Sequence, residues 1–153
     1  MSRSLWVVAL MCVVWACGDR TDPPAGGAAN AAPPAGVRWE LVTMGGSAPA
    51  RPVTLELGTD GCMTVKGMIN RHSGTFVAQD GGLSLTVTQR TLAGGEEALQ
   101  GPEARLIAAV AGVARYRVED SLLTVTGTGE ELVFKRSADT TPIPPGRPFP
   151  RSR

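Results

Sequence analysis

Apolar and polar residues alternate through the middle of this 153-residue chain, and a period of two restricts those segments to half-buried β-strands. The clearest runs are Val53–Leu57 and Leu83–Thr88, where Val and Leu alternate with Thr, Ser or Glu. Six shorter segments follow the same pattern between turns rich in Gly, Asp or Ser: Trp39–Thr43, Met63–Val65, Phe76–Ala78, Tyr116–Val118, Leu123–Val125 and Leu132–Phe134. The sequence therefore predicts about eight short antiparallel strands.

One segment departs from this alternation and has helical spacing instead. Within Pro102–Val113, the apolar residues Leu106, Ile107 and Val110 recur at helical spacing after a Gly-Pro start. Glu103 stands in the first turn, where an acidic side chain is favourable. The pattern predicts one amphipathic helix that covers an open end or face of the strands. Together these elements predict a mainly β domain, either a small barrel or a curled sandwich.

The amino-terminal residues have the pattern of a secretory signal. Arg3 precedes an apolar run, Leu5–Ala16, of about a dozen residues, which is shorter than the ~20 that a spanning helix needs. Small or aliphatic residues come before Cys17, as in bacterial lipoproteins, although Trp15 is bulkier than that pattern favours. We expect residues 1–16 to be removed as a lipoprotein signal peptide and Cys17 to carry palmitate. Ordinary secretory cleavage and an uncleaved anchor are the alternatives.

Lipidation of Cys17 predicts a protein of the cell envelope that faces the periplasm and contacts the membrane through its lipid. Gly18 stands where Asp retains some lipoproteins at the inner membrane, so we expect the outer membrane. Residues 17–36 are rich in Pro, Ala and Gly and predict a flexible tether. Residues 137–153 are also Pro-rich and predict a disordered tail, with a weak basic or polyproline contact to envelope polymer or a partner as the alternative. One domain, residues 37–136, remains between them.

Composition argues against a nucleic-acid partner and against an internal disulfide. Lys plus Arg number 15 and Asp plus Glu number 14, so the net charge is +1 and no attraction to nucleic acid is expected. Once the signal is removed and Cys17 is lipidated, only Cys62 remains, and no internal disulfide can form. We expect Cys62 to be a half-buried strand residue, with a free thiol or an intermolecular bridge as the alternative.

Several short motifs occur in a recognisable order: Trp39-Glu40-Leu41, Val53-Thr54-Leu55, Gly67 with Asn70, Gly74 and Phe76, Thr88–Ala93, Glu103 at the helix, Tyr116-Arg117-Val118 and Leu132-Val133-Phe134. In this order they resemble the META domain, also called HslJ-like, over about residues 39–136. That family usually has Gly-Cys-Asn in its central turn, where this chain has Met68-Ile69-Asn70. The resemblance implies an antiparallel β-barrel of lipocalin-like topology with one helix, an association with envelope physiology or stress, and no established catalytic centre.

The segment from Asn70 to Gly74 is the main candidate site. Asn side chains bond their own backbone and Gly supplies positive φ, so we expect a structural turn that holds two strands in register. Arg71 and His72 lie within it, and we expect His72 in a polar turn. Projected from this loop, Arg71 and His72 are the candidate contacts for a partner or ligand at a barrel mouth.

Residue types and spacing give no support to a metal, a cofactor or a catalytic centre. The mature domain has one His and one Cys without the spacing of a zinc site, and no G-x-S-x-G turn is present. We therefore expect a protein that is not an enzyme. Two functions remain open: a module that binds another envelope protein, and a carrier of a small apolar ligand in the barrel interior. Strand residues dominated by Leu, Val, Phe and Trp would fill a small barrel, which favours the interaction module.

Overall fold

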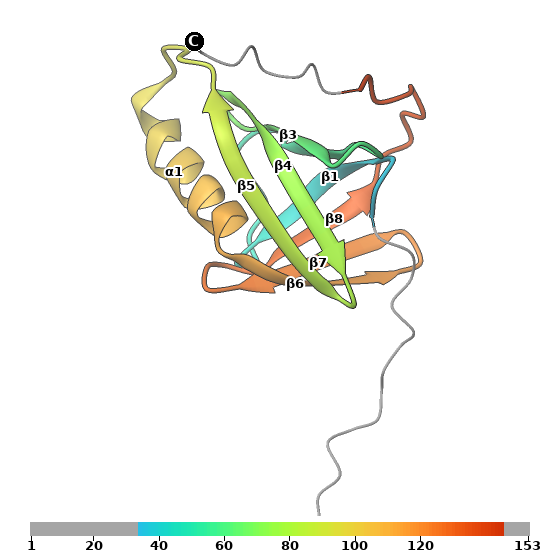
Figure 1. The fold of residues 1–153 in the computed structure, drawn as a ribbon. Coiled ribbons are helices and arrows are strands. Elements are labelled where there is room, and N and C mark those ends of the chain that lie inside the picture. The colour runs from blue at the N-terminus through green and yellow to red at the C-terminus, as the bar shows by residue number, and fades with distance from the viewer. Residues whose placement is uncertain (1–33, 146–153) are drawn as a thin grey trace, which may run out of the picture.

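The computed structural model describes residues 34–145, which form a closed antiparallel barrel with one helix (Figure 1). Each strand pairs with its neighbours in sequence, and the last strand returns to pair with the first. The elements are β1 (Val37–Met44), β2 (Thr54–Leu57), β3 (Cys62–Lys66), β4 (Arg71–Gln79), β5 (Gly82–Arg90), α1 (Glu97–Ala111), β6 (Val113–Glu119), β7 (Leu122–Gly127) and β8 (Leu132–Arg136). The expected mainly β barrel of eight short strands with one helix is confirmed.

The strand register explains how the alternating residues fill the interior. Leu55 lies opposite Val65 and Leu57 lies opposite Met63, so these four side chains point to the same face of the sheet. Large side chains that are at most 2% exposed come from several strands and from α1: Trp39, Leu55, Leu57, Met63, Leu106, Leu123, Leu132 and Phe134. The interior is therefore packed with side chains of the protein itself.

The barrel closes with a short pairing between β5 and β6. β4 and β5 pair from His72 with Arg90 to Gln79 with Gly82, whereas the β5–β6 register consists of Gly82 with Arg115. The helix α1 lies along the side of β5 that faces away from β4 (Figure 1). The helix thus covers the side of the barrel beside β5, where its amphipathic pattern predicted that it would cover a face of the strands.

The helix begins earlier than predicted. It starts at Glu97 rather than at Pro102, and it ends at Ala111, where Gly112 caps it. Pro102 lacks a backbone donor and its ring crowds the preceding turn, but the buried side chain of Leu99 anchors that turn. No helix within residues 34–145 is long and apolar enough to cross a bilayer.

Contacts before β1 and after β8 extend beyond the expected boundaries of residues 37–136. The indole Nε1–H of Trp39 donates to the carbonyl of Pro34 at 3.2 Å. After β8, the backbone N–H of Ser137 donates to the carbonyl of Arg38 at 2.9 Å, and its hydroxyl donates to Glu40 at 2.7 Å. The start of the segment expected to be disordered is thus held against β1 by hydrogen bonds. Residues 1–33 and 146–153, with the predicted signal, Cys17 and most of the tether, lie outside the described residues.

Candidate functional site

A carboxylate lies buried in the apolar stripe of α1. Leu99, Glu103, Leu106 and Val110 are spaced by four, three and four residues and are all buried. Glu103 is only 6% exposed. A buried carboxylate destabilises the folded protein unless hydrogen bonds compensate its charge. The hydrogen-bond partners of Glu103 therefore explain how it is tolerated here.

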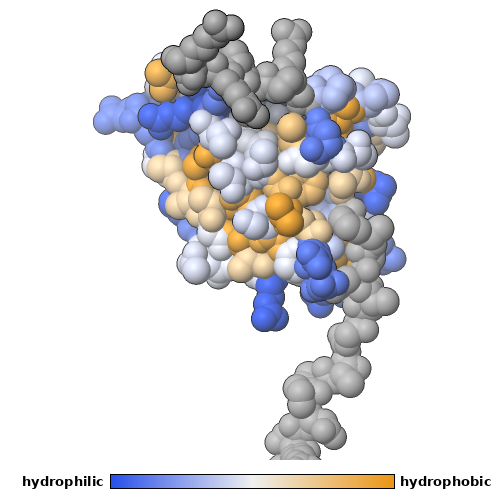
Figure 2. All heavy atoms as spheres, viewed as in Figure 1, coloured by the Kyte–Doolittle hydropathy of each residue, from blue (hydrophilic) through white to orange (hydrophobic). Residues whose placement is uncertain are grey.

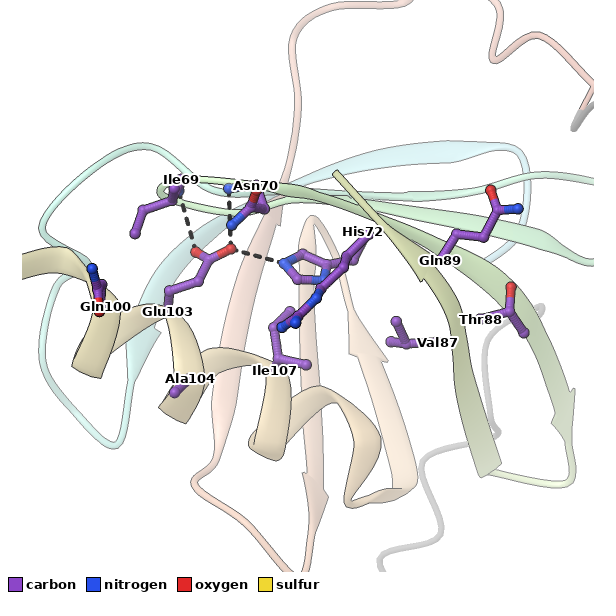
Figure 3. Close-up of a pocket in the computed structure, with 11 residues that line it drawn as sticks. Ile69, Asn70, His72, Val87, Thr88, Gln89, Gln100, Glu103, Ala104 and Ile107 are labelled. Carbon is purple, nitrogen blue, oxygen red and sulfur yellow. Dashed lines mark hydrogen bonds and ion pairs between the residues drawn. The ribbon is translucent and has the colours of Figure 1, made fainter. Parts of the chain in front are cut away.

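Four groups point at the carboxylate of Glu103, and three of them belong to the turn between β3 and β4. Oε2 accepts the backbone N–H of Met68 at 2.7 Å and that of Ile69 at 3.3 Å. Oε1 accepts the backbone N–H of Asn70 at 3.2 Å and lies 2.8 Å from Nε2 of His72 (Figure 3). Since the three backbone groups can only donate, the carboxylate acts as the acceptor and the arrangement favours a proton on Nε2. We call Glu103, His72 and the turn Gly67–Asn70 the carboxylate clamp.

Gly67 makes room for this clamp. A Cβ atom at Gly67 would lie 2.5 Å from both carboxylate oxygens of Glu103, closer than such atoms approach in proteins. The turn itself is closed by a hydrogen bond from the N–H of Gly67 to the carbonyl of Asn70, at 2.8 Å. The absence of a side chain therefore allows the backbone to wrap around the carboxylate.

The expected loop from Asn70 to Gly74 is wrong in extent, because Arg71 begins strand β4. Lys66 pairs with Arg71 and Val65 with His72, so the β3–β4 ladder continues up to a short turn at Gly67–Asn70. His72 is consequently an inward-facing strand residue, 4% exposed, instead of a residue in a polar turn. Its Nε2 faces Glu103, while Nδ1 has no hydrogen-bond partner among the described residues.

The other residues singled out in the sequence have local structural contacts. The side-chain oxygen of Asn70 accepts the N–H of Ala93 at 2.9 Å and so ties the turn to the segment after β5. A Cβ at Gly74 would lie 1.8 Å from the carbonyl oxygen of Thr86. This glycine therefore permits a close approach beside the register shift between β4 and β5, and it does not serve a positive φ. Arg71 is exposed, and Cys62 lies half-buried in β3 as expected.

A pocket of about 580 Å³ opens beside the carboxylate clamp, between α1 and the end of β5 (Figure 3). Its walls combine the apolar side chains of Ile69, Val87 and Ile107 with polar ones, among them Arg90. This volume is in the range of small ligand sites, roughly 300–1,000 Å³. Glu103 lies at its inner wall, but hydrogen bonds already compensate its carboxylate, which makes this residue an anchor of the fold rather than a reactive acid.

The structural contact between Glu103 and His72 was not predicted from the sequence. Glu103 was interpreted as a favourable first-turn acid, yet it lies between Leu99 and Leu106 on the buried stripe. An acid at a core-facing helical position was the available signal, together with a single histidine in an alternating strand. Within residues 34–145, no group of three His, Cys, Asp or Glu side chains is placed to hold a metal ion.

Comparison with known proteins identifies a family and a shared fold. The META domain family matches residues 32–139 of the chain. A protein from Burkholderia xenovorans, solved by NMR, is 21% identical with a TM-score of 0.56, covering 68% of this chain and 83% of its own. A second NMR structure is 17% identical with a TM-score of 0.53, covering 65% of this chain and 87% of its own. No curated protein gives a significant match.

Proposed function

The chain belongs to the META domain family, and from this we propose that it is a non-catalytic, lipid-anchored envelope protein that binds another envelope protein through the outside of its barrel. The anchor rests on the apolar run Leu5–Ala16 and on Cys17, and the tether of residues 17–36 would hold the barrel away from the membrane. The periplasmic face of the outer membrane is the proposed location. A role in envelope physiology or stress is the broader setting.

The filled interior is the observation that supports binding on the outside. Trp39 and Phe134 are at most 1% exposed and occupy the interior together with strand residues and Leu106 of α1. A carrier of apolar molecules needs a cavity that encloses most of its ligand. In this barrel, side chains of the protein occupy that volume, which favours the interaction module over the carrier.

The outer surface carries apolar side chains that a partner would cover. Val77 on β4 is 67% exposed and Leu92, after β5, is 83% exposed. Figure 2 shows apolar residues gathered on the face that presents β5 and α1. Exposed apolar side chains gathered on one face are typical of interaction sites.

Two measurements in the native cells test this proposal. Cells fed an alkyne-tagged fatty acid should label the wild-type protein and place it in the membrane fraction, and Cys17→Ser should abolish both. Absence of label on the wild type would refute the lipid anchor. For the interaction, a photo-crosslinking residue at Val77 or Leu92 should join the protein to one envelope protein, whereas the same residue at the exposed Arg117 should not. Equal crosslinking from all three positions, or none, would refute a specific outer binding surface.

A further inference from the structure

The segment that follows β8 stays against the outer wall of the barrel as far as residue 145 (Figure 1). The carboxylate of Asp139 forms an ion pair with Arg38 of β1, and Arg38 also pairs with Glu56 of β2 at 2.7 Å. The second carboxylate oxygen of Asp139 accepts the N–H of Thr141 at 2.9 Å. These contacts fix the direction in which the chain continues. We call residues 137–145 the C-terminal strap.

The end of the C-terminal strap lies over the outward face of β2, β3 and β4. Residues 143–145 form one wall of a hollow of about 440 Å³. The facing wall contains outward-pointing residues of the three strands, among them Glu56, Cys62, Thr64 and Ser73. Ile143 is half-buried, whereas the other residues from 138 to 145 are exposed. Ile143 is therefore the apolar side chain that anchors the end of the strap.

The burial of the strands beneath the strap agrees with this cover. Cys62 and Thr64 point outward from β3, yet both are half-buried. Ser84 and Thr86 occupy equivalent outward positions on β5, which lies outside the hollow, and both are exposed. Short polar side chains on the outside of a strand are thus shielded where the strap lies over them.

Proline suits a segment that lies across this face. The backbone of β3 is paired with β2 on one side and with β4 on the other, so the face of the sheet offers few free backbone groups to a segment on top of it. Pro142, Pro144 and Pro145 have no N–H to satisfy, and the N–H of Thr141 bonds to Asp139. A proline-containing segment therefore leaves few backbone donors without a partner when it docks here.

We propose that the outward face of β2–β4 is a docking site for extended, proline-containing segments, and that the C-terminal strap occupies it in cis. A short flexible connection gives a tethered segment an effective concentration on the order of millimolar, so a partner's segment binds only when the strap opens. The strap is thus an autoinhibitory cover. This site is separate from Val77 and Leu92, and the inference depends on neither the lipid anchor nor the partner proposed for that surface.

Alkylation of Cys62 reports whether the strap covers this face, because Cys62 lines the hollow beneath it. The full chain is treated with N-ethylmaleimide, and mass spectrometry follows the peptide that contains Cys62. Ile143→Gln removes the apolar anchor and should raise the alkylation rate about fivefold or more, whereas the same residue at the exposed Thr140 should change it by less than about twofold. Equal rates in the two variants would overturn the cover.

Thermal unfolding of the same two variants separates a cover from a part of the folded core. Both should keep the unfolding midpoint of the wild type, because the strap lies on the outside of a barrel whose interior is filled by other residues. A large drop in the midpoint of Ile143→Gln alone would show that the strap is integral to the barrel and does not open, which would also overturn the proposal.

A capped peptide of residues 139–145 tests docking in trans. At concentrations on the order of millimolar it should shift the amide NMR signals of Thr64 and Ser73 in the full-length Ile143→Gln variant. The shifts should be at least about threefold smaller in the wild type, where the strap competes. The same peptide with Ser in place of its prolines should bind at least about threefold more weakly, because proline favours the extended conformation before binding.

Each arm of the peptide experiment can contradict the proposal. No shift of Thr64 and Ser73 in Ile143→Gln would refute the docking site. Shifts of equal size in the wild type would refute occupancy by the strap. Equal binding of the Ser peptide would refute the preference for proline.

Discussion

Replacing Glu103 by Gln tests whether the carboxylate clamp holds the β3–β4 turn against α1. Gln has nearly the same shape, so the substitution changes only charge and hydrogen bonding. In the wild type, Oε2 accepts two backbone N–H groups and Oε1 accepts one, besides facing His72. The amide NH₂ of Gln cannot accept, and the least costly orientation points it at His72, which can change tautomer and accept from it.

Even in that orientation, the backbone N–H of Asn70 loses its acceptor, and the remaining bonds lose the strength that the charge provides. A buried donor without a partner costs about 1–3 kcal/mol, and a hydrogen bond to a charged group contributes roughly 1.5–3 kcal/mol. We therefore expect Glu103→Gln to lower the free energy of unfolding by about 2–4 kcal/mol in urea titrations. Amide hydrogen exchange at Met68, Ile69 and Asn70 should accelerate.

The control is Glu97→Gln, an exposed acid in the first turn of the same helix. It should change the free energy of unfolding by less than about 0.5 kcal/mol. If Glu103→Gln costs no more than Glu97→Gln, or stabilises the protein, the carboxylate is not what fixes the turn. A loss of stability with unchanged exchange at residues 68–70 would also contradict this reasoning, since the damage would then lie elsewhere.

Further predictions concern the core, one close backbone approach and the segment after β8. Leu85→Ala should cost about 2–5 kcal/mol in urea titrations, against under about 1 kcal/mol for the exposed neighbour Thr86→Ala; equal costs would contradict the assigned faces. Gly74→Ala should cost more than about 2 kcal/mol in the same assay, because its Cβ would meet a backbone oxygen that no side-chain motion can displace. The hydrogen bond from Ser137, and then that from Lys135, lowers the pKa of Glu40. These bonds therefore stabilise the folded protein fully above the pKa that Glu40 has in the unfolded chain. That stabilisation is lost as the pH falls through the pKa of Glu40 in the folded protein. The stability difference between wild type and Ser137→Ala should accordingly be present at about pH 7 and shrink below about pH 4; a difference independent of pH would refute this linkage.

Local patterns in the sequence were sufficient to predict the number of strands and most of their positions, but they missed the start of β4 at Arg71. In Leu83–Thr88, for example, the side-chain period of two corresponds directly to the alternation of buried and exposed residues in β5. The start of α1 was less predictable because Pro102 is a typical first-turn residue, and only the burial of Leu99 extends the helix before it.

The carboxylate clamp could not be derived from local patterns. Glu103 and His72 are 31 residues apart, and they meet only because β4 begins at Arg71 and α1 lies alongside β5. The sequence predicts a turn at Asn70 and gives Gly67 only as part of the motif that resembles the family, whereas the carboxylate that this turn surrounds comes from a distant helix. The short pairing of β5 with β6 likewise depends on the register between two strands, which no single strand encodes.

Titration of the folded wild-type protein with a fluorescent fatty acid tests most directly the claim that binding takes place outside a filled barrel. Because Trp39, Phe134 and their neighbours fill the interior, we expect no saturable binding at concentrations where lipid carriers saturate. Leu85→Ala, which removes buried volume, provides a variant in which any new binding would reveal the probe's access to the core. Saturable binding of one probe per wild-type molecule would contradict the filled interior and identify the barrel as a carrier.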